Sequence, residues 1–208
     1  MKRKSQKRSQ HDIKNEAIFE AGKRVFLKFG FKSSSMDEIA REACVSKRTI
    51  YQHYGNKEAL FQAVLSKHWE QVFAVNDELF IKEKSISENL KSFASTFLNF
   101  LYKKDTIDLF RILISESNLF PSLTTKLLVD DKPPFTKQLI EFLKAKDKTG
   151  EIYIKNAERS ASYFLGLLKE YHFWPMMLGF TKEKQQKNQN VLIDEAIRIF
   201  LKGHLKSG

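Results

Sequence analysis

Apolar residues recur at intervals of three and four along most of the chain, which is the spacing that gathers them on one face of an α-helix. No stretch alternates with the period of two that a half-buried strand would show. We therefore expect an all-α fold, with one short extended piece around Tyr153. Pro133 and Pro134 interrupt one of the helical stretches. The predicted helices are 12–29, a short helix from 36, then 47–54, 56–80, 87–102, 106–120, 122–129, 135–145, 158–178 and 188–205.

The stretch Met36 to Leu60 predicts two short helices joined by a tight turn, followed by the start of a third. Ser35 and Glu38 have the spacing of a capping box, which satisfies backbone N–H groups at a helix start. Ser46 is a suitable N-cap for the second helix, which Gly55 should end. Two short helices connected in this way form a helix-turn-helix arrangement.

Positive charge collects in the same part of the chain. The net charge of the 208 residues is +11. Residues 1–57 hold 14 Lys or Arg and 6 Asp or Glu, a net charge of +8, and the other 151 residues carry only +3. Binding to nucleic-acid phosphates with counterion release requires such a local excess. Residues 1–11 are polar and basic, and we weigh equally a DNA-contacting arm and a solubilising tail.

The segment GFKSSSMDEIAREACVSKRTIYQHYGNKEALF, residues 30–61, resembles the DNA-binding signature of the TetR family of bacterial transcriptional regulators. The match includes, in order and spacing, Gly30, Ser34, Ser35, Ile39, Ala40, Ala43, Val45, Ser46, Tyr51, His53, Lys57, Glu58 and Leu60. Two positions depart from the family pattern: Cys44 replaces the usual Gly, and Tyr54 the usual Phe. If the turn requires a left-handed backbone at position 44, Cys costs roughly 1–2 kcal/mol relative to Gly.

The resemblance implies a repressor that binds a palindromic double-stranded DNA operator as a homodimer, with the helix 47–54 in a major groove. Lys47 and Arg48 lie in the first turn of that helix, where side chains reach base edges, and Arg48 suits a bidentate contact to guanine. The predicted DNA-binding residues are Ser34, Ser35, Lys47, Arg48, Thr49, Tyr51, Gln52, His53 and Lys57. Thr49 suits a thymine methyl or a phosphate and Gln52 an adenine, whereas the Ser, Tyr, His and Lys57 side chains better suit phosphate.

The rest of the chain predicts a larger helical domain for ligand binding and dimerisation. We divide the chain into a DNA-binding domain, 1–57, and a regulatory domain, 58–208. The last two helices carry more apolar surface than one core can use, which suggests a dimer interface; the family forms a four-helix bundle there. Ala161, Ser162 and Gly166 are small and nearly in register, which lets another helix approach closely. Segments around 109–123 and 165–179 loosely resemble the regulatory domain of one large TetR subgroup.

An apolar cavity for a small apolar or aromatic inducer is expected in this domain. The candidate lining residues are Trp69, Phe73, Phe97, Phe110, Glu116, Phe120, Glu170, Tyr171 and Trp174. Each aromatic residue could equally be ordinary core, and Glu116 could instead pair with Arg111. His68 suits a core or boundary position better than a metal site.

Other function classes find little support. There is no Gly-rich phosphate loop, nucleophile elbow or metal-spaced set of His and Cys, so we expect no enzyme, cofactor or metal. The single Cys44 excludes an internal disulfide, and no apolar run approaches the ~20 residues that span a membrane. We expect a cytoplasmic protein. The alternative function is a TetR-fold DNA-binding structural protein that recruits a protein partner without a small-molecule ligand.

Overall fold

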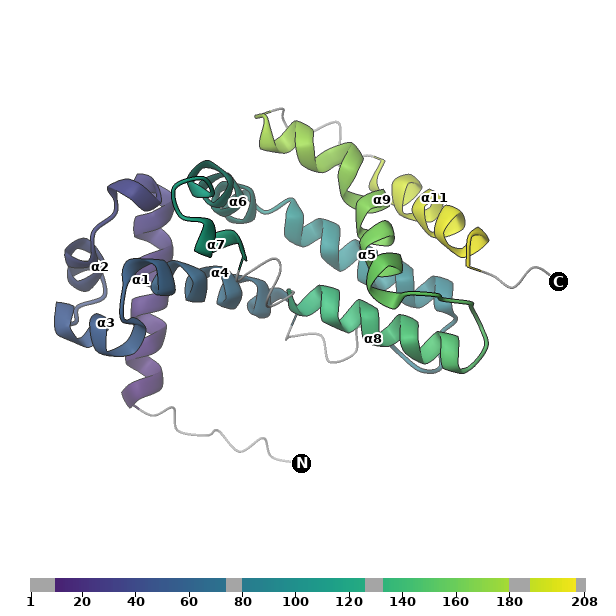
Figure 1. The fold of residues 1–208 in the computed structure, drawn as a ribbon, viewed down its shortest axis with the longest axis horizontal. Coiled ribbons are helices and arrows are strands. Elements are labelled where there is room, and N and C mark those ends of the chain that lie inside the picture. The colour runs from purple at the N-terminus through teal and green to yellow at the C-terminus, as the bar shows by residue number, and fades with distance from the viewer. Residues whose placement is uncertain (1–9, 74–79, 126–132, 180–187, 205–208) are drawn as a thin grey trace. The chain divides into compact units, whose positions relative to one another are not determined.

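The computed structural model describes residues 10–73, 80–125, 133–179 and 188–204. Within these ranges the chain forms helices and connecting segments and no β-strand, as expected. The helices are α1 (Gln10–Ser33), α2 (Met36–Glu42), α3 (Lys47–Tyr54), α4 (Lys57–Phe73), α5 (Ile86–Leu101), α6 (Lys104–Glu116), α7 (Pro121–Thr125), α8 (Pro134–Lys148), α9 (Ala157–Met177) and α11 (Gln189–Lys202) (Figure 1). The ends expected at 80, 129 and 205, and most of the basic tail, lie outside the described residues.

The chain divides into two compact units. The first comprises residues 1–67 and 108–129, and the second comprises 68–107 and 130–208. The helix α4 therefore begins in one unit and ends in the other. Residues 108–125 belong to the same compact unit as the helix-turn-helix, although the sequence-based division assigns them to the regulatory domain. The functional boundary after residue 57 remains a prediction.

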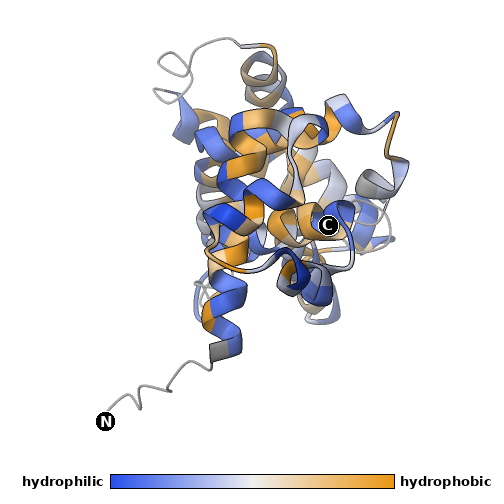
Figure 2. Cartoon of the chain, turned by 90° about the vertical axis from the view of Figure 1, so that its left-hand side faces the viewer, coloured by the Kyte–Doolittle hydropathy of each residue, from blue (hydrophilic) through white to orange (hydrophobic). Residues whose placement is uncertain are grey.

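Aromatic side chains form the core of the first unit. The rings of Phe26, Phe31 and Phe61 are completely buried and lie 4.9–6.0 Å apart between centroids. Burying a Phe side chain stabilises a fold by about 1.5–3 kcal/mol. Ile39 of α2 and Ile50 of α3 are also fully buried, so each short helix is fixed by its own apolar residue. Figure 1 shows α2 and α3 beside α1, and Figure 2 shows hydrophobic and hydrophilic residues distributed around the turns of the helices.

The predicted caps of the helix-turn-helix are confirmed. The Ser35 hydroxyl accepts the Glu38 N–H at 3.1 Å, and the Glu38 carboxylate accepts the Ser35 N–H in return. The Ser46 hydroxyl accepts the Thr49 N–H at 3.1 Å. Gly55, with φ of 76°, ends α3 in a backbone region that non-glycine residues rarely adopt.

The turn between α2 and α3 is a Schellman motif with Cys44 at the position where glycine is usual. The Val45 N–H donates to the Ala40 carbonyl at 3.0 Å, and the Cys44 N–H donates to the Arg41 carbonyl at 3.3 Å. Cys44 has φ of 53°, the only positive value at a non-glycine residue that the structure describes. The cost predicted for Cys44 from the sequence applies only if the backbone there is left-handed. This backbone conformation is present at Cys44.

Gly30 interrupts α1 rather than ending it. Its φ of 76° and ψ of 174° are not helical, yet helical turns continue to Ser33. Phe31 is directed into the core at this point and is fully buried. The predicted end of the first helix at Phe29 therefore corresponds to a kink, after which the chain turns once more before α2.

The second unit is built from α5, α8, α9 and α11. Contacts join α8 to α9, and α11 to both α5 and α9. Phe93, Phe97 and Phe164 form one continuous set of ring contacts with Phe200. The extended piece holds Ile152 and Ile154 buried and Tyr153 exposed, and the Tyr153 N–H donates to the His204 carbonyl at 2.7 Å. None of the helices described is long and apolar enough to cross a membrane.

Candidate nucleic-acid interface

The helix α3 presents polar side chains outward on one face. Lys47, Arg48, Tyr51 and Gln52 are exposed, at a spacing of one, four and five residues that places them side by side on a helix. Ile50, on the opposite face, is fully buried. Tyr51 is 43% exposed. The exposed face of α3 therefore carries cationic, amide and phenol groups together, and the buried Ile50 anchors the opposite face in the core.

An ion pair connects the two helices of the motif. The Lys47 ammonium lies 2.8 Å from the Asp37 carboxylate, and this hydrogen bond is the main reason that the pKa of Lys47 is raised. Both groups are largely exposed, so the pair is weak in free energy. The contact with Asp37 uses one of the three ammonium protons of Lys47. Arg24 and Glu42 form a similar pair at 2.8 Å between α1 and α2.

Two of the predicted phosphate-binding residues, Ser34 and Ser35, use their hydroxyl groups in contacts within the protein. Ser34 is buried, and its hydroxyl donates to the carbonyls of Gly30 and Val25. The Ser35 hydroxyl belongs to the capping box. Neither hydroxyl is thus presented as an exposed phosphate donor, and their role in DNA binding stays a prediction.

The contacts of the Lys57 side chain differ most from the predicted phosphate binding. Its ammonium donates to the carbonyls of Phe31 at 2.9 Å, Lys32 at 3.2 Å and Ser34 at 2.8 Å. It also lies 4.7 Å from the centre of the Phe31 ring. All three ammonium protons are therefore used to stabilise carbonyls at the end of α1. Lys57 thus links the start of α4 to the end of α1, and its role in DNA binding stays a prediction.

Thr49 and His53 lie at the edges of the exposed face. Both are half-buried, and the Thr49 hydroxyl lies 2.8 Å from the Ser46 hydroxyl. The His53 ring contacts the ring of His11, with centroids 4.8 Å apart. Sequence reasoning missed His11, because its position in the predicted tail gave no reason to place it beside α3. Tyr54 is half-buried, and burial together with the Glu16 charge raises the pKa of its phenol.

The candidate inducer-binding residues are divided between the two compact units. Phe110, Glu116 and Phe120 belong to the first unit, and the other six to the second. Trp69 and Phe97 are buried, whereas Glu170, Tyr171 and Trp174 are exposed, and the Phe73 side chain lies outside the description. Glu116 accepts the Lys32 N–H at 3.3 Å, and Arg111 pairs with Asp108 instead of Glu116. The inducer-binding role of these residues stays a prediction.

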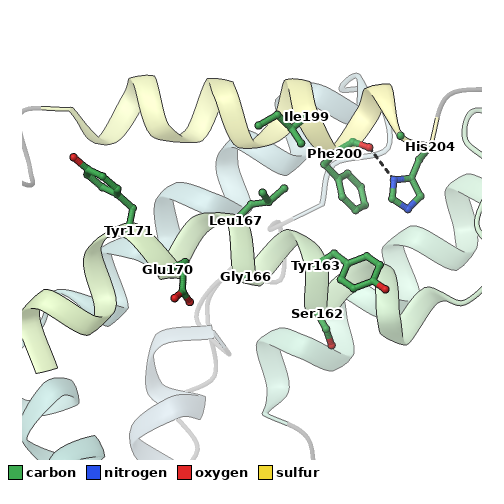
Figure 3. A pocket seen from close by; sticks show the side chains of 10 residues that line it. Ser162, Tyr163, Gly166, Leu167, Glu170, Tyr171, Ile199, Phe200 and His204 are labelled. Carbon is green, nitrogen blue, oxygen red and sulfur yellow. Dashed lines mark hydrogen bonds between the residues drawn. The ribbon is translucent and has the colours of Figure 1, made fainter.

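A groove of about 720 Å³ lies between α9 and α11 of the second unit. Figure 3 shows Leu167 and Phe200 directed toward the space between the two helices, whereas the Glu170 carboxylate points away from α11. Tyr163 and Tyr171 flank the groove and are 59% and 74% exposed. Only Glu170 and Tyr171 of the nine candidates line it. The small residues Ser162 and Gly166 were the sequence signal for this surface.

No group of three or more His, Cys, Asp or Glu side chains suitable for a metal ion occurs among the described residues. His68 is buried, and its Nε2 forms a hydrogen bond of 2.9 Å with the Thr106 hydroxyl inside the second unit.

Comparison with known proteins matches both parts of the chain. The family model described as bacterial regulatory proteins, tetR family, matches residues 18–64, and that of the AefR-like transcriptional repressor C-terminal domain matches residues 88–203. The transcriptional regulator YvkB of Bacillus subtilis is 26% identical over 191 residues, which are 91% of this chain and 96% of YvkB.

Two solved structures illustrate the similarity of the fold. A TetR-family regulator from Mesorhizobium loti has a TM-score of 0.82 at 20% identity, over 95% of this chain and all of the other. The flavonoid-responsive regulator FrrA has a TM-score of 0.78 at 26% identity, over 94% of this chain and 98% of FrrA.

Proposed function

Because the chain belongs to the TetR family of transcriptional regulators, we propose that it is a repressor that binds a palindromic operator as a homodimer and is released by a small apolar or aromatic inducer. In this proposal residues 1–57 bind DNA, and residues 58–208 bind the inducer and form the dimer. The observation that carries it is the exposed polar face of α3, held from behind by the buried Ile50.

Base recognition rests on the first turn and the exposed face of α3. The Arg48 guanidinium has the planar donor pair that matches guanine O6 and N7, and the Gln52 amide matches adenine N6 and N7. Tyr51 suits a phosphate oxygen, and Thr49 a phosphate or thymine methyl. Lys47 adds positive charge to this face. The Ser46 cap stabilises the start of this helix, and the buried Ile50 anchors it in the core.

Footprinting on the DNA upstream of the chain's own gene tests the operator and the dimer together. We expect protection of two inverted half-sites about one helical turn apart, because a two-fold symmetric dimer presents two copies of α3. Protection of one half-site, or uniform protection at high protein concentration, would contradict the proposal of a palindromic operator.

The groove between α9 and α11 supports the proposed dimer. It is apolar, and the exposed Tyr163, Tyr171 and Ile199 extend its hydrophobic surface. A Cβ at Gly166 would meet no atom within 4 Å, so the protomer itself does not require a glycine there. A glycine within a helix costs about 1 kcal/mol relative to alanine, and a close approach of a second helix would explain it. We therefore propose that the two protomers of the repressing dimer contact each other at this surface.

Light scattering of two Gly166 variants tests this interface. Gly166→Ala should remain a dimer, whereas Gly166→Leu should shift the protein toward monomers at the same concentration while its helix content is unchanged. A Gly166→Leu protein that dimerises like Gly166→Ala would contradict the placement of the interface.

The inducer is proposed to act through residues 108–125. Phe120 packs against Phe31 with ring centroids 4.9 Å apart, Glu116 accepts the Lys32 N–H, and the Gln62 amide donates to the Ser122 carbonyl at 2.8 Å. These contacts reach the end of α1 that Lys57 also holds. A ligand that moves this segment would therefore disturb the orientation of the helix-turn-helix.

FrrA is responsive to flavonoids, so a flavonoid set is a reasonable first screen for apolar aromatic inducers. By linkage, an inducer that weakens DNA binding must itself bind more weakly to the DNA complex by the same factor. A compound that binds tightly without changing DNA affinity is not the inducer. If no compound of any class releases the DNA and a protein partner binds the complex, the structural-protein alternative is favoured.

A further inference from the structure

Two histidines from distant parts of the sequence meet at one end of α3. His11 lies in the first turn of α1 and is exposed, and His53 lies in the last turn of α3 and is half-buried. Their ring centroids are 4.8 Å apart, and the ring planes are tilted by 47°. The His11 Nδ1 also lies 3.2 Å from the Asn15 amide nitrogen. The pair therefore adjoins the face of α3 that carries the proposed DNA contacts.

We propose that His11 and His53 form a proton-dependent contact to the DNA backbone, so that the affinity for DNA rises as the pH falls through the neutral range. The inference rests on the proposed DNA-binding function and adds a second residue, His11, to the phosphate-contacting surface. Phosphate is the natural ligand for such a pair, because a protonated imidazole is a cation that donates from both ring nitrogens.

Two imidazolium charges side by side would repel each other. Charges of the same sign a few ångströms apart disfavour each other. Lys14 of α1 and Lys47 and Arg48 of α3 add further positive charge on these two helices. A DNA phosphate beside the pair would reduce the repulsion between two such charges.

Two acidic residues of α1 lie close to His11 in the sequence. Asp12 directly follows it in the first turn, and the Glu16 carboxylate pairs with the Lys67 ammonium of α4 at 2.5 Å. Tyr54, whose ring centroid lies 6.3 Å from that of His53, has a raised pKa and so remains neutral in the physiological range. An incoming phosphate would bring further negative charge beside the two rings.

The sign of the effect follows from linkage. Histidine gains its proton between about pH 8 and pH 5, so a phosphate beside the pair favours the protonated form. Binding then takes up protons, and the association constant increases as the pH falls. Uptake of one proton gives at most about a tenfold increase per pH unit. If the two rings only stacked and DNA bound elsewhere, the affinity would not depend on their protonation.

The test measures fluorescence anisotropy with a labelled duplex from upstream of the gene and a scrambled duplex, at several pH values from about 6 to about 8 and at constant ionic strength. Because a phosphate contact is independent of base sequence, both duplexes should show the same pH slope. We expect the wild-type association constant to increase about three- to tenfold per pH unit as the pH falls.

Two single variants, His11→Gln and His53→Gln, and the double variant identify the source of the slope. Gln retains a polar side chain but does not titrate. The double variant should lose most of the slope, whatever its affinity for DNA near pH 8. The matched control is His172→Gln, which changes a histidine of α9 in the second unit and should keep the wild-type slope. Other groups that titrate near neutrality contribute equally to all these proteins.

Two outcomes would overturn the inference. A double variant with the wild-type slope would exclude the pair as its source, while specific DNA binding would leave the proposed function intact. Absence of DNA binding at every pH would contradict the proposed function as well. If the double variant does not fold, imidazole proton NMR of the wild type decides the matter: we expect proton uptake at both rings on adding DNA, and unchanged titration would overturn the inference.

Discussion

Replacement of Lys57 by Met separates a structural role from a DNA-contacting role for this lysine. The substitution keeps an unbranched side chain and removes the ammonium from the Phe31 ring and from the carbonyls of Phe31, Lys32 and Ser34. Hydrogen bonds from a charged group contribute about 1.5–3 kcal/mol each when counted singly. Here three bonds share one ammonium, whose desolvation offsets part of the gain, so we expect a loss of about 2–3 kcal/mol in total.

Thermal unfolding followed by circular dichroism measures this loss. For a protein of this size, 1 kcal/mol corresponds to about 2–4 °C, so Tm should fall by about 4–12 °C. The control is Lys155→Met, which removes an exposed lysine outside the helices and should leave Tm nearly unchanged. A Lys57→Met protein with the Tm of this control would refute the structural role.

The salt dependence of DNA binding provides the opposite test. If Lys57 contacted a phosphate, its removal would lower the slope of the logarithm of affinity against the logarithm of salt concentration by about one unit. We expect no such change below the unfolding temperature, because the ammonium is already occupied by carbonyl groups. A lowered slope at unchanged Tm would restore the phosphate-binding interpretation.

Two further substitutions test other parts of the structure. Cys44→Gly should stabilise the protein by about 0.5–1 kcal/mol in urea unfolding, because relief of the left-handed strain at φ of 53° exceeds the added entropy of the unfolded chain; equal stability of Cys44→Gly and Cys44→Ala would contradict the strain. Burial raises the pKa of Tyr102 to about 12. Because the unfolded state ionises first, stability should be full below about pH 10 and decline as the pH rises toward 12, and Tyr102→Phe should reduce this decline in urea unfolding at several alkaline pH values.

Short-range features of the first unit could be predicted from the sequence. The capping box of Ser35 and Glu38, the N-cap at Ser46 and the stop at Gly55 each depend on residues within one helical turn, and all are present. The conditional cost at Cys44 could be stated for the same reason, since the family pattern expects glycine there. Each of these signals determines the local backbone geometry by itself, so the order and type of the helices could be predicted from them.

Contacts between distant residues could not be predicted in this way. The Lys57 hydrogen bonds bridge residues 23 to 26 positions apart, and the Glu116 contact to Lys32 bridges 84. A lysine in a DNA-binding signature suggests phosphate, and nothing in its neighbours reveals a set of backbone carbonyls that only the folded chain brings together. The contact between His11 and His53 could not be predicted for the same reason, because it joins residues that are distant in the sequence.

The inducer-pocket candidates show a different limit. Aromatic residues were selected by type, and type does not distinguish a buried core ring such as Phe97 from an exposed one such as Tyr171. The selection therefore combined residues of both compact units. The groove between α9 and α11 was better indicated by small residues in helical register, because a small side chain marks where another surface can approach.

The central claim is that the exposed face of α3 reads base sequence, and one measurement tests it most directly. The affinities of wild type and Arg48→Ala are compared on the footprinted operator and on a scrambled duplex by fluorescence anisotropy at one salt concentration. A bidentate arginine contributes about 1–3 kcal/mol of discrimination at each half-site. We therefore predict a strong wild-type preference for the operator that falls at least tenfold in Arg48→Ala. An unchanged preference, with both affinities lowered equally, would show that Arg48 contributes only charge and would contradict the account.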